Sequence, residues 1–337
     1  MNKLMKFVVA VLALVLVGSC AVASEPARKV VLSFAAQEVG TAPYSYAKAL
    51  QSVMAKALPE GSEVLVVSTS SGGVSSPQLI QTGECNITLS NSAPAKWSKK
   101  GELVGREATP DVVALAGGIG KDFVNVLFTK KFVDETGITT LEELVAKKYP
   151  ARIVVKRQGT LGELTAEKVF EALGVKLSDV VEWGGVVEKT SPYAIKSGLQ
   201  TDEYEVTIDH VGEGQRHTSE LCFTHEMYFV QLSDETLAKL VEEGYDYVTM
   251  NAGTWFGQAQ EIKTVGSQQC VIVSKNMPDE IAYLLTKAMC ENALALGEAV
   301  PAMYSFKPER AGDINLTGVE LHPGAKKYYV EKGYITE

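Results

Sequence analysis

The feature that most constrains the fold of this chain is a repeated alternation of strand-like and helix-like segments. Residues 30–34 and 63–68 are short apolar runs typical of strands, and each is followed by a polar loop and a segment with helical spacing of apolar residues. A second cycle begins with the strand-like run 123–129 and the capping box that starts at Thr140. Such alternation predicts parallel sheets with crossover helices, which is the α/β class.

The later part of the chain indicates a return to a lobe that the chain has already left. After the two cycles come a β-like run over residues 264–274 and a long expected helix over 278–296. We place the two crossings near residues 117–120 and 264–266, because glycines there tolerate the dihedral changes of a hinge. Ordinary turns are the alternative interpretation. The expected organisation is a signal peptide over residues 1–23, a first part of lobe 1 over 24–118, lobe 2 over 119–263, and a hinge return with C-terminal helices that complete lobe 1 over 264–337.

The N-terminal segment indicates export. Lys3 and Lys6 precede an unbroken apolar run over residues 7–17, which is too short for a permanent transmembrane anchor. Ala21-Val22-Ala23 has the small-x-small pattern of a signal peptidase site and predicts a soluble mature chain. The preceding residues resemble a lipobox, and the alternative is a lipid tether at Cys20. Both outcomes place the mature chain outside the cytoplasm.

The charge of the chain excludes some partners. Its formal net charge is -9, and the signal peptide carries two of its lysines. An acidic exported protein is a poor candidate for binding nucleic acid or an anionic membrane surface. The same charge repels anionic ligands at long range, so a carboxylate site would depend on local donors.

Four cysteines remain in the mature chain, and they are widely spaced with no Cys-x-x-Cys pair. Three disulfide pairings or four buried thiols are compatible with this spacing. We expect thiols, because a chain of this size has an adequate core without disulfides. The residues are Cys85, Cys222, Cys270 and Cys290.

Three polar, glycine-bearing loops follow expected strands and precede expected helices, at residues 37–44, 69–76 and 157–163. Ligands of α/β proteins collect beyond the carboxyl ends of strands, where backbone N–H groups and hydroxyls hold carboxylate or phosphate oxygens. Any one loop is equally well an exposed turn, but three in equivalent positions favour a ligand site. The ligand-binding candidates in and beside these loops are Gln37, Gly40, Thr41, Tyr44, Ser71, Gly72, Gly73, Val74, Ser90, Asn91, Arg157, Gly159, Thr160 and Gly162.

A further polar cluster lies at residues 209–217, where an acid, two imidazoles and an arginine occur within nine residues. Asp209 directly follows an expected strand and is therefore placed to point into a cleft. Arg216, like Arg157, is a hypothetical partner for a ligand carboxylate. The spacing of the histidines does not match a metal site on one helical face, so we expect no metal. Trp255 is a candidate pocket wall, with ordinary packing as the alternative.

Motifs for catalysis or nucleotide binding are missing from the sequence. There is no Gly-x-Ser-x-Gly, no His-Glu-x-x-His, no Gly-x-x-x-x-Gly-Lys-Ser/Thr and no Gly-x-Gly-x-x-Gly. We therefore expect neither an enzyme nor a cofactor. A periplasmic enzyme that uses Asp209 or His210 is the minor alternative.

Several motifs, in order, resemble the TAXI type of substrate-binding protein from tripartite ATP-independent periplasmic (TRAP) transporters. Residues 321–333, Leu-His-Pro-Gly-Ala-Lys-Lys-Tyr-Tyr-Val-Glu-Lys-Gly, closely follow the family's C-terminal signature. Residues 67–84 resemble its Ser/Thr-Gly-Gly loop and the Gly-Glu turn after it. Residues 159–174 resemble the loop and helix of its second lobe, and residues 253–258 resemble a Gly-Thr-Tyr-x-Gly-Gln element. Together the resemblance covers about residues 30–332.

The resemblance implies an α/β, two-lobed, type II periplasmic-binding-protein-like fold with hinge-crossing strands. It implies an extracytoplasmic solute-binding subunit that captures a small, carboxylate-bearing solute by hinge closure and delivers it to the TRAP membrane permease subunits. The expected location is the periplasm, and no cofactor is implied. The alternative function is a ligand-sensing periplasmic protein that feeds a membrane receptor.

Overall fold

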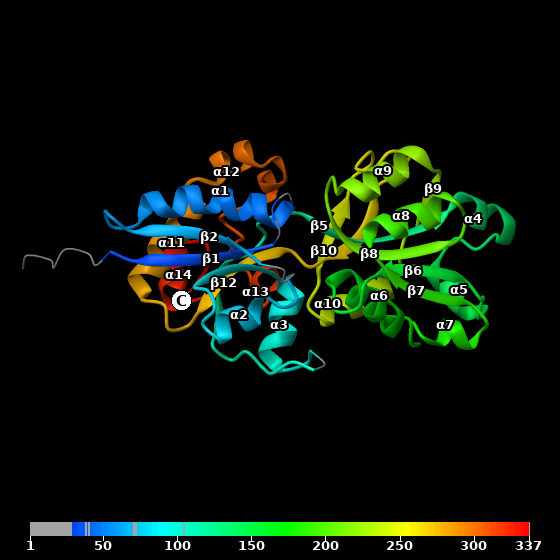
Figure 1. Cartoon of the computed structure of the whole chain (residues 1–337), viewed down its shortest axis with the longest axis horizontal. Coiled ribbons are helices and arrows are strands. Elements are labelled where there is room, and N and C mark those ends of the chain that lie inside the picture. Colours follow the sequence, from blue (N-terminus) through cyan, green and yellow to red (C-terminus); the bar gives the residue numbers. More distant parts are fainter. Residues whose placement is uncertain (1–28, 38, 40, 70–72, 104, 337) are drawn as a thin grey trace, which may run out of the picture.

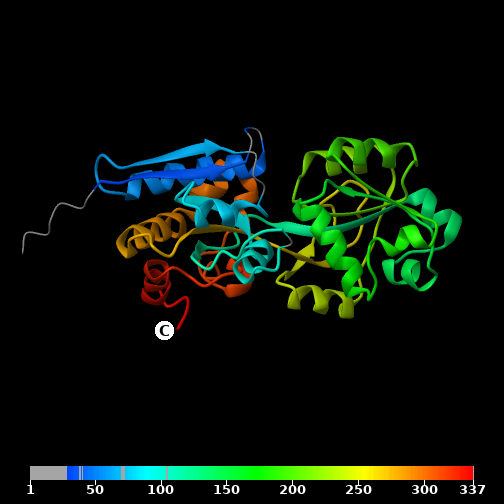
Figure 2. The ribbon, with the colours of Figure 1, turned by 60° about the horizontal axis from the view of Figure 1, so that its bottom comes forward.

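The computed structural model describes residues 29–37, 39, 41–69, 73–103 and 105–336. The expected signal peptide and the alternative tether at Cys20 lie outside the described residues, as do the candidate site residues Gly40, Ser71 and Gly72. Figure 1 shows two lobes side by side, each built around its own sheet, and Figure 2 shows the same two bodies from another direction. Among the described residues, no helix is both long and apolar enough to cross a bilayer.

The first lobe is built on a five-stranded sheet with the order β2-β1-β3-β12-β4. β1 lies parallel to β2 and β3, whereas β12 is inserted antiparallel between β3 and β4. The lobe therefore combines strands from both ends of the described chain. Its strands are β1 (Val31–Ala36), β2 (Glu63–Ser68), β3 (Ile87–Asn91), β4 (Val112–Ala116) and β12 (Gln269–Ser274). Its helices are α1 (Ala42–Ala57), α2 (Ser76–Gln81), α3 (Ser92–Lys100), α11 (Asp279–Glu291), α12 (Ala293–Ala299), the 3-10 helix η1 (Pro301–Ser305), α13 (Ile314–Thr317) and α14 (Pro323–Glu331).

The second lobe is built on a five-stranded sheet with the order β7-β6-β8-β5-β9. β6 lies parallel to β7 and β8, while β5 lies antiparallel to β8 and β9. One apolar cluster covers each face of this sheet. Its strands are β5 (Asp122–Thr129), β6 (Arg152–Lys156), β7 (Val186–Thr190), β8 (Val206–Gly212) and β9 (Met227–Phe229). Its helices are α4 (Lys130–Thr136), α5 (Leu141–Ala146), α6 (Leu161–Ala172), α7 (Asp179–Glu182), α8 (Pro192–Gln200), α9 (Arg216–Thr224) and α10 (Asp234–Glu242).

Two short segments carry the chain between the sheets. Residues 117–121 join β4 to β5, and residues 267–268 join β11 (Ile262–Gly266) to β12. β11 pairs antiparallel with β10 (Asp246–Met250). Glycine is required at these crossings by close packing: a β-carbon on Gly117 would overlap the carbonyl of Leu316, and one on Gly266 would overlap the carbonyl of Asp122.

Two expected elements are each divided in the structure. The expected β run 264–274 is the end of β11 and the whole of β12, which belong to different sheets. The expected helix 278–296 is interrupted at Asn292, whose φ of -115° and ψ of 22° are not helical. Both breaks fall at polar residues that interrupt the apolar pattern, Ser267-Gln268 in the β run and Glu291-Asn292 in the helix. Packing against different neighbours sets the breaks.

Candidate functional site

A polar cluster at the crossings joins the two lobes. Asn91, at the end of β3, donates from Nδ2 to Asp122 Oδ2 at 3.1 Å and to the carbonyl of Ser267 at 2.6 Å. Asn91 comes from the first lobe, whereas Asp122 begins β5 of the second lobe and Ser267 lies in the return crossing. His210 of β8 completes the cluster, because its Nε2 accepts a hydrogen bond from the N–H of Ser267 at 2.9 Å.

Burial controls the charge state of this cluster. Asp122 is only 4% exposed, and its carboxylate also interacts with the side chain of Gln269. Desolvation raises the pKa of Asp122 to about 6, although Asn91 and Gln269 favour the charged form. Desolvation lowers the pKa of His210 to about 3, so its imidazole is neutral and serves as an acceptor.

Three of the sequence-predicted residues meet at this cluster. Ser90 donates from Oγ to the carbonyl of Gly73 at 2.8 Å. A β-carbon on Gly73 would lie 2.6 Å from Asn91 Oδ1, so a larger residue there would displace the amide. The loop after β2 and the end of β3 are therefore packed together, although β1 lies between the two strands in the sheet.

Asp209 lies inside β8, which continues to Gly212, so the expectation that it directly follows a strand was wrong. The strand is longer because residues 209–212 pair with residues 122–125 of β5. Asp209 forms an ion pair with Lys156 of β6 at 2.9 Å and accepts from the N–H of His210 at 2.7 Å. Burial raises the pKa of Asp209, and Lys156 opposes this effect. A β-carbon on Gly162 would overlap Asp209 Oδ1, which brings these two predicted residues together.

The loop after β6 forms a capping box at the start of α6. Thr160 Oγ1 accepts from the N–H of Glu163 at 3.3 Å, and Glu163 Oε2 accepts from the N–H of Gly159 at 3.0 Å. Thr160 also donates to the carbonyl of Arg157 at 2.7 Å. The Arg157 side chain is exposed and forms no ion pair with a described residue. Hydrogen bonds within the loop thus fix its conformation. They leave the guanidinium of Arg157 available to a ligand.

A cavity of about 770 Å³ lies between residues of the two lobes. This volume falls in the range of about 300–1,000 Å³ for small-molecule sites. The first lobe contributes Val74, Lys96, Trp97 and Arg106 to its wall, and the second lobe contributes Gly159, Glu163, Lys189 and Glu243, among others. Val74 and Gly159 were predicted from the sequence, whereas the charged wall was not.

Most cations of this cavity are already paired. Lys189 contacts Glu163 at 2.6 Å and Glu167 at 3.1 Å, and Lys168 contacts Glu171 and Glu243, both at 2.9 Å. Arg106 differs, because its guanidinium forms no ion pair within the described part of the chain. Sequence reasoning missed Arg106, since it lies in an irregular segment after α3 rather than directly after a strand.

Other predicted residues lie apart from this cavity. Trp255 is 2% exposed and packs in the apolar core of the second lobe. Thr41 caps α1 by accepting from the N–H of Tyr44, and Tyr44 packs partly buried against the core of the first lobe. The carbonyl of Gln37 accepts from Ser68 Oγ at 3.2 Å.

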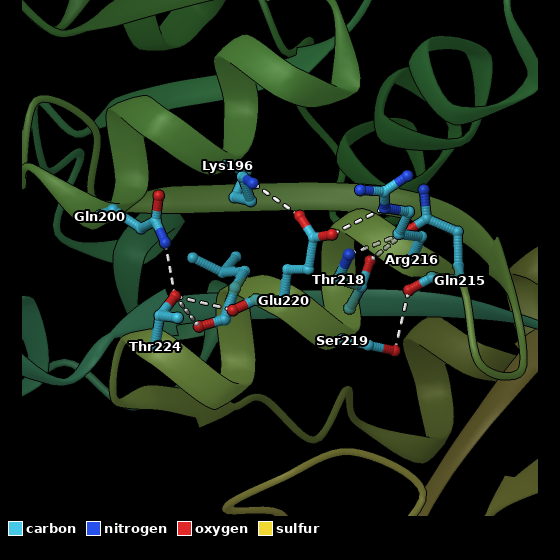
Figure 3. Close-up of polar contacts among 9 residues, drawn as sticks. Lys196, Gln200, Gln215, Arg216, Thr218, Ser219, Glu220 and Thr224 are labelled. Carbon is cyan, nitrogen blue, oxygen red and sulfur yellow. Dashed lines mark hydrogen bonds and ion pairs between the residues drawn. The ribbon is translucent and has the colours of Figure 1, made fainter.

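Arg216 is engaged on the surface of α9, as Figure 3 shows. Its Nε contacts Glu220 at 2.7 Å, and its side chain is 84% exposed. Lys196 of α8 contacts the same carboxylate at 2.6 Å. The two cations, Lys196 first, lower the pKa of Glu220 to about 2.

The four cysteines are free and buried in the structure, as expected. Burial raises the pKa of Cys85 to about 11 and the pKa of Cys222, Cys270 and Cys290 to about 12. Such thiols are protonated and poorly reactive at neutral pH.

A direct bridge between the lobes lies beside the cavity. Trp97 of α3 donates from Nε1 to the carbonyl of Glu243 at 2.7 Å, and Lys96 donates to the carbonyl of Glu242 at 3.0 Å. The Trp97 ring also meets Tyr245 edge-on, with 5.9 Å between centroids. These contacts hold α3 of the first lobe against the end of α10.

Trp97→Phe should weaken this bridge, with Trp255→Phe as the matched control. Both indoles are buried, but Trp255 Nε1 has no hydrogen-bond partner among the described residues, so its substitution removes none of these bonds. We expect Trp97→Phe to lower the free energy of unfolding by about 1 kcal/mol more than the control, measured by urea denaturation. Equal losses in the two variants would show that the Trp97 hydrogen bond does not stabilise the bridge.

The family model for the NMT1-like family matches residues 34–333. The chain belongs to the NMT1-like family. This family corresponds to the TAXI-type substrate-binding proteins of TRAP transporters, so the resemblance found in the sequence motifs is confirmed. NMT1-like proteins of this group are solute-binding proteins of transporters and not enzymes.

Solved structures share the fold at low sequence identity. A TctC solute binding protein from Polaromonas is 14% identical, with a TM-score of 0.54 over 93% of this chain and 100% of that chain. A TRAP periplasmic solute binding protein from Rhodobacter sphaeroides is 11% identical, with a TM-score of 0.47 over 90% of each chain. The periplasmic aliphatic sulphonate binding protein SsuA from Escherichia coli is 9% identical, with a TM-score of 0.46 over 89% of this chain and 78% of that chain. The predicted two-lobed, type II periplasmic-binding-protein-like α/β fold is confirmed.

Proposed function

We propose that this protein is the extracytoplasmic solute-binding subunit of a TRAP transporter. It captures a small carboxylate-bearing solute between its lobes and delivers it to the membrane permease subunits. The observation that carries this proposal is the cavity of about 770 Å³, whose wall comes from both lobes and includes Arg106, which forms no ion pair with a described residue. The working location is the periplasm, reached through the signal peptide over residues 1–23, with a tether at Cys20 as the alternative processing product.

Capture requires that the ligand contact both lobes. A ligand in the cavity meets Val74 and Arg106 on one side and the loop before α6 on the other. Because a ligand that touches both lobes binds their closed arrangement more strongly, it shifts the population toward closure. The short crossings at residues 117–121 and 267–268 are the segments about which this rotation takes place.

The carboxylate preference follows from the available donors. Arg106 lines the cavity and Arg157 lies on the adjoining loop, and neither forms an ion pair with a described residue. A guanidinium binds a carboxylate with two parallel hydrogen bonds, which are stronger than neutral ones. Of the remaining loop candidates, Gly159 lines the cavity and Thr160 follows it, and these would supply backbone and hydroxyl groups around the rest of the solute.

A thermal-shift screen of the mature protein against organic acids and amino acids tests this proposal. A ligand at 100 times its Kd should stabilise the protein by about 2.7 kcal/mol. With the best acid, Arg106→Ala or Arg157→Ala should weaken affinity by at least about tenfold, since a hydrogen bond to a charged group contributes about 1.5–3 kcal/mol. Arg216→Ala is the matched control and should leave affinity unchanged, because Arg216 is exposed and paired with Glu220. Unchanged affinity in both Arg106→Ala and Arg157→Ala would exclude the carboxylate assignment.

A further inference from the structure

The second lobe contains a small cavity between its sheet and the helices α8 and α9, with several polar side chains in a largely apolar wall. Its volume is about 20 Å³, and its wall includes Thr207 of β8, Asn125 of β5 and His217 of α9. A buried cavity of at least about 10–15 Å³ accommodates one water molecule, provided that the molecule finds two to four polar partners. The size therefore suits a single water and nothing larger.

Two polar atoms of this wall are buried without a partner. Thr207 Oγ1 and His217 Nδ1 are both inaccessible, and neither forms a hydrogen bond within the described chain. Thr207 is 4% exposed and Asn125 is 3% exposed, and the side-chain amide of Asn125 also forms no hydrogen bond with a described residue. Leaving such groups unsatisfied is costly, so native proteins pair nearly all of them with protein or water.

The placement of these side chains on the sheet is regular. Asn125 is paired with Asp209, and Thr207 lies two residues before Asp209 on the same strand. Because side chains alternate along a strand, Thr207 and Asp209 share one face of the sheet, and α9 covers that face. These polar side chains face a layer that is otherwise apolar. Their hydrogen-bonding groups are satisfied if a polar molecule occupies the cavity.

The charges around the cavity favour a neutral occupant. Asp209 is paired with Lys156 at 2.9 Å, and Lys196 is paired with Glu220 at 2.6 Å, so both charged residues of the wall are already compensated. Figure 3 shows the Lys196–Glu220 contact joining α8 to α9. An ion in the cavity would have no free counter-charge, whereas water both donates and accepts.

We propose that this cavity is a binding site for one water molecule, which bridges Thr207 Oγ1 on β8 to His217 Nδ1 on α9. Asn125 is its third partner. The water ties the first turn of α9 to the beginning of β8, the strand that carries Asp209. This site is independent of the solute that the protein carries.

The deciding experiment combines a high-resolution crystal structure with three isosteric threonine-to-valine variants. The structure should contain one density peak within hydrogen-bond distance of Thr207 Oγ1 and His217 Nδ1. Thr207→Val should lower the melting temperature. Thr264→Val should also lower it and is the positive control, because Thr264 lies on a strand and its hydroxyl donates to the carbonyl of Val124 at 2.7 Å. Thr286→Val is the opposite control. Thr286 lies on α11, which packs in the apolar core of the first lobe, and its buried Oγ1 has no hydrogen-bond partner in the part of the chain that the structure describes.

The two controls give the Thr207 result a defined meaning. Removing an unpartnered hydroxyl should leave the melting temperature unchanged or raise it, as expected for Thr286→Val. If Thr207→Val behaves like Thr286→Val, or if no density peak occupies the cavity, the site is dry and the proposal is wrong. A peak together with a loss like that of Thr264→Val supports it.

Discussion

Asn91→Asp should lower the free energy of unfolding by more than about 3 kcal/mol at about pH 7.5. The substitution places a second carboxylate where the Asn91 amide now donates to Asp122 at 3.1 Å, and it removes the donor to the Ser267 carbonyl. Two carboxylates at this distance repel each other, and Asp122 is too buried for water to screen the repulsion. Urea denaturation of the variant and the parent measures the loss.

An exchanged pair provides the control for this prediction. Asn91→Asp combined with Asp122→Asn swaps the amide and the carboxylate, so one donor again faces one acceptor. The double variant should recover most of the lost stability, which makes the coupling energy between the two positions large. If Asn91→Asp is as stable as the parent, or if the double variant is no better than the single one, the Asn91–Asp122 contact does not join the lobes as described.

Asp122→Asn alone should stabilise the protein by up to about 3 kcal/mol at about pH 7.5, and this gain should vanish below about pH 4. Burial raises the pKa of Asp122 from its ordinary 3.8 to about 6 in the folded protein. Between these two values the folded state holds a proton that the unfolded state has released. The carboxyl group therefore lowers stability as the pH rises through this window, and an amide does not.

Unfolding curves at several pH values test this second prediction. The parent should lose stability relative to Asp122→Asn between about pH 4 and about pH 6, with a constant difference above that window. His210, whose pKa is lowered from 6.5 to about 3, costs the parent and the variant the same stability as the pH falls through this window, because the unfolded chain takes up a proton that the folded chain does not. Its contribution therefore cancels in the difference between the two proteins. A variant that is less stable than the parent at every pH would show that the ionised carboxylate is a net stabiliser.

The sequence predicted best those elements whose signal is local. β2 was expected with the same bounds, because it is a short β-branched run between turns. The capping box at Thr140 was also correct, with its hydroxyl accepting from the N–H of Glu143 at 3.1 Å. β7 was not expected, since its Val-Val-Glu-Lys-Thr sequence lacks alternation and its residues are partly exposed at the sheet edge.

The candidate site was predictable only in part, because its contacts join distant residues. Gly73 and Asn91 were found from loop chemistry after strands, a rule that uses neighbouring residues alone. Their partners Asp122 and Ser267 lie 31 and 176 residues from Asn91, and no local pattern marks such pairs. Arg106 follows no strand directly, so that rule passed over it.

The antiparallel insertion of β12 has a consequence for how this protein is made. All strands of the second sheet lie before residue 230, whereas the first sheet needs residues 269–274 between β3 and β4. During synthesis the sheet of the first lobe therefore stays split, with two unpaired edges, after every strand of the other sheet has left the ribosome. Unpaired strand edges recruit strands of other chains. Until β12 is available, the edges of β3 and β4 that it covers are therefore open to pairing with another chain.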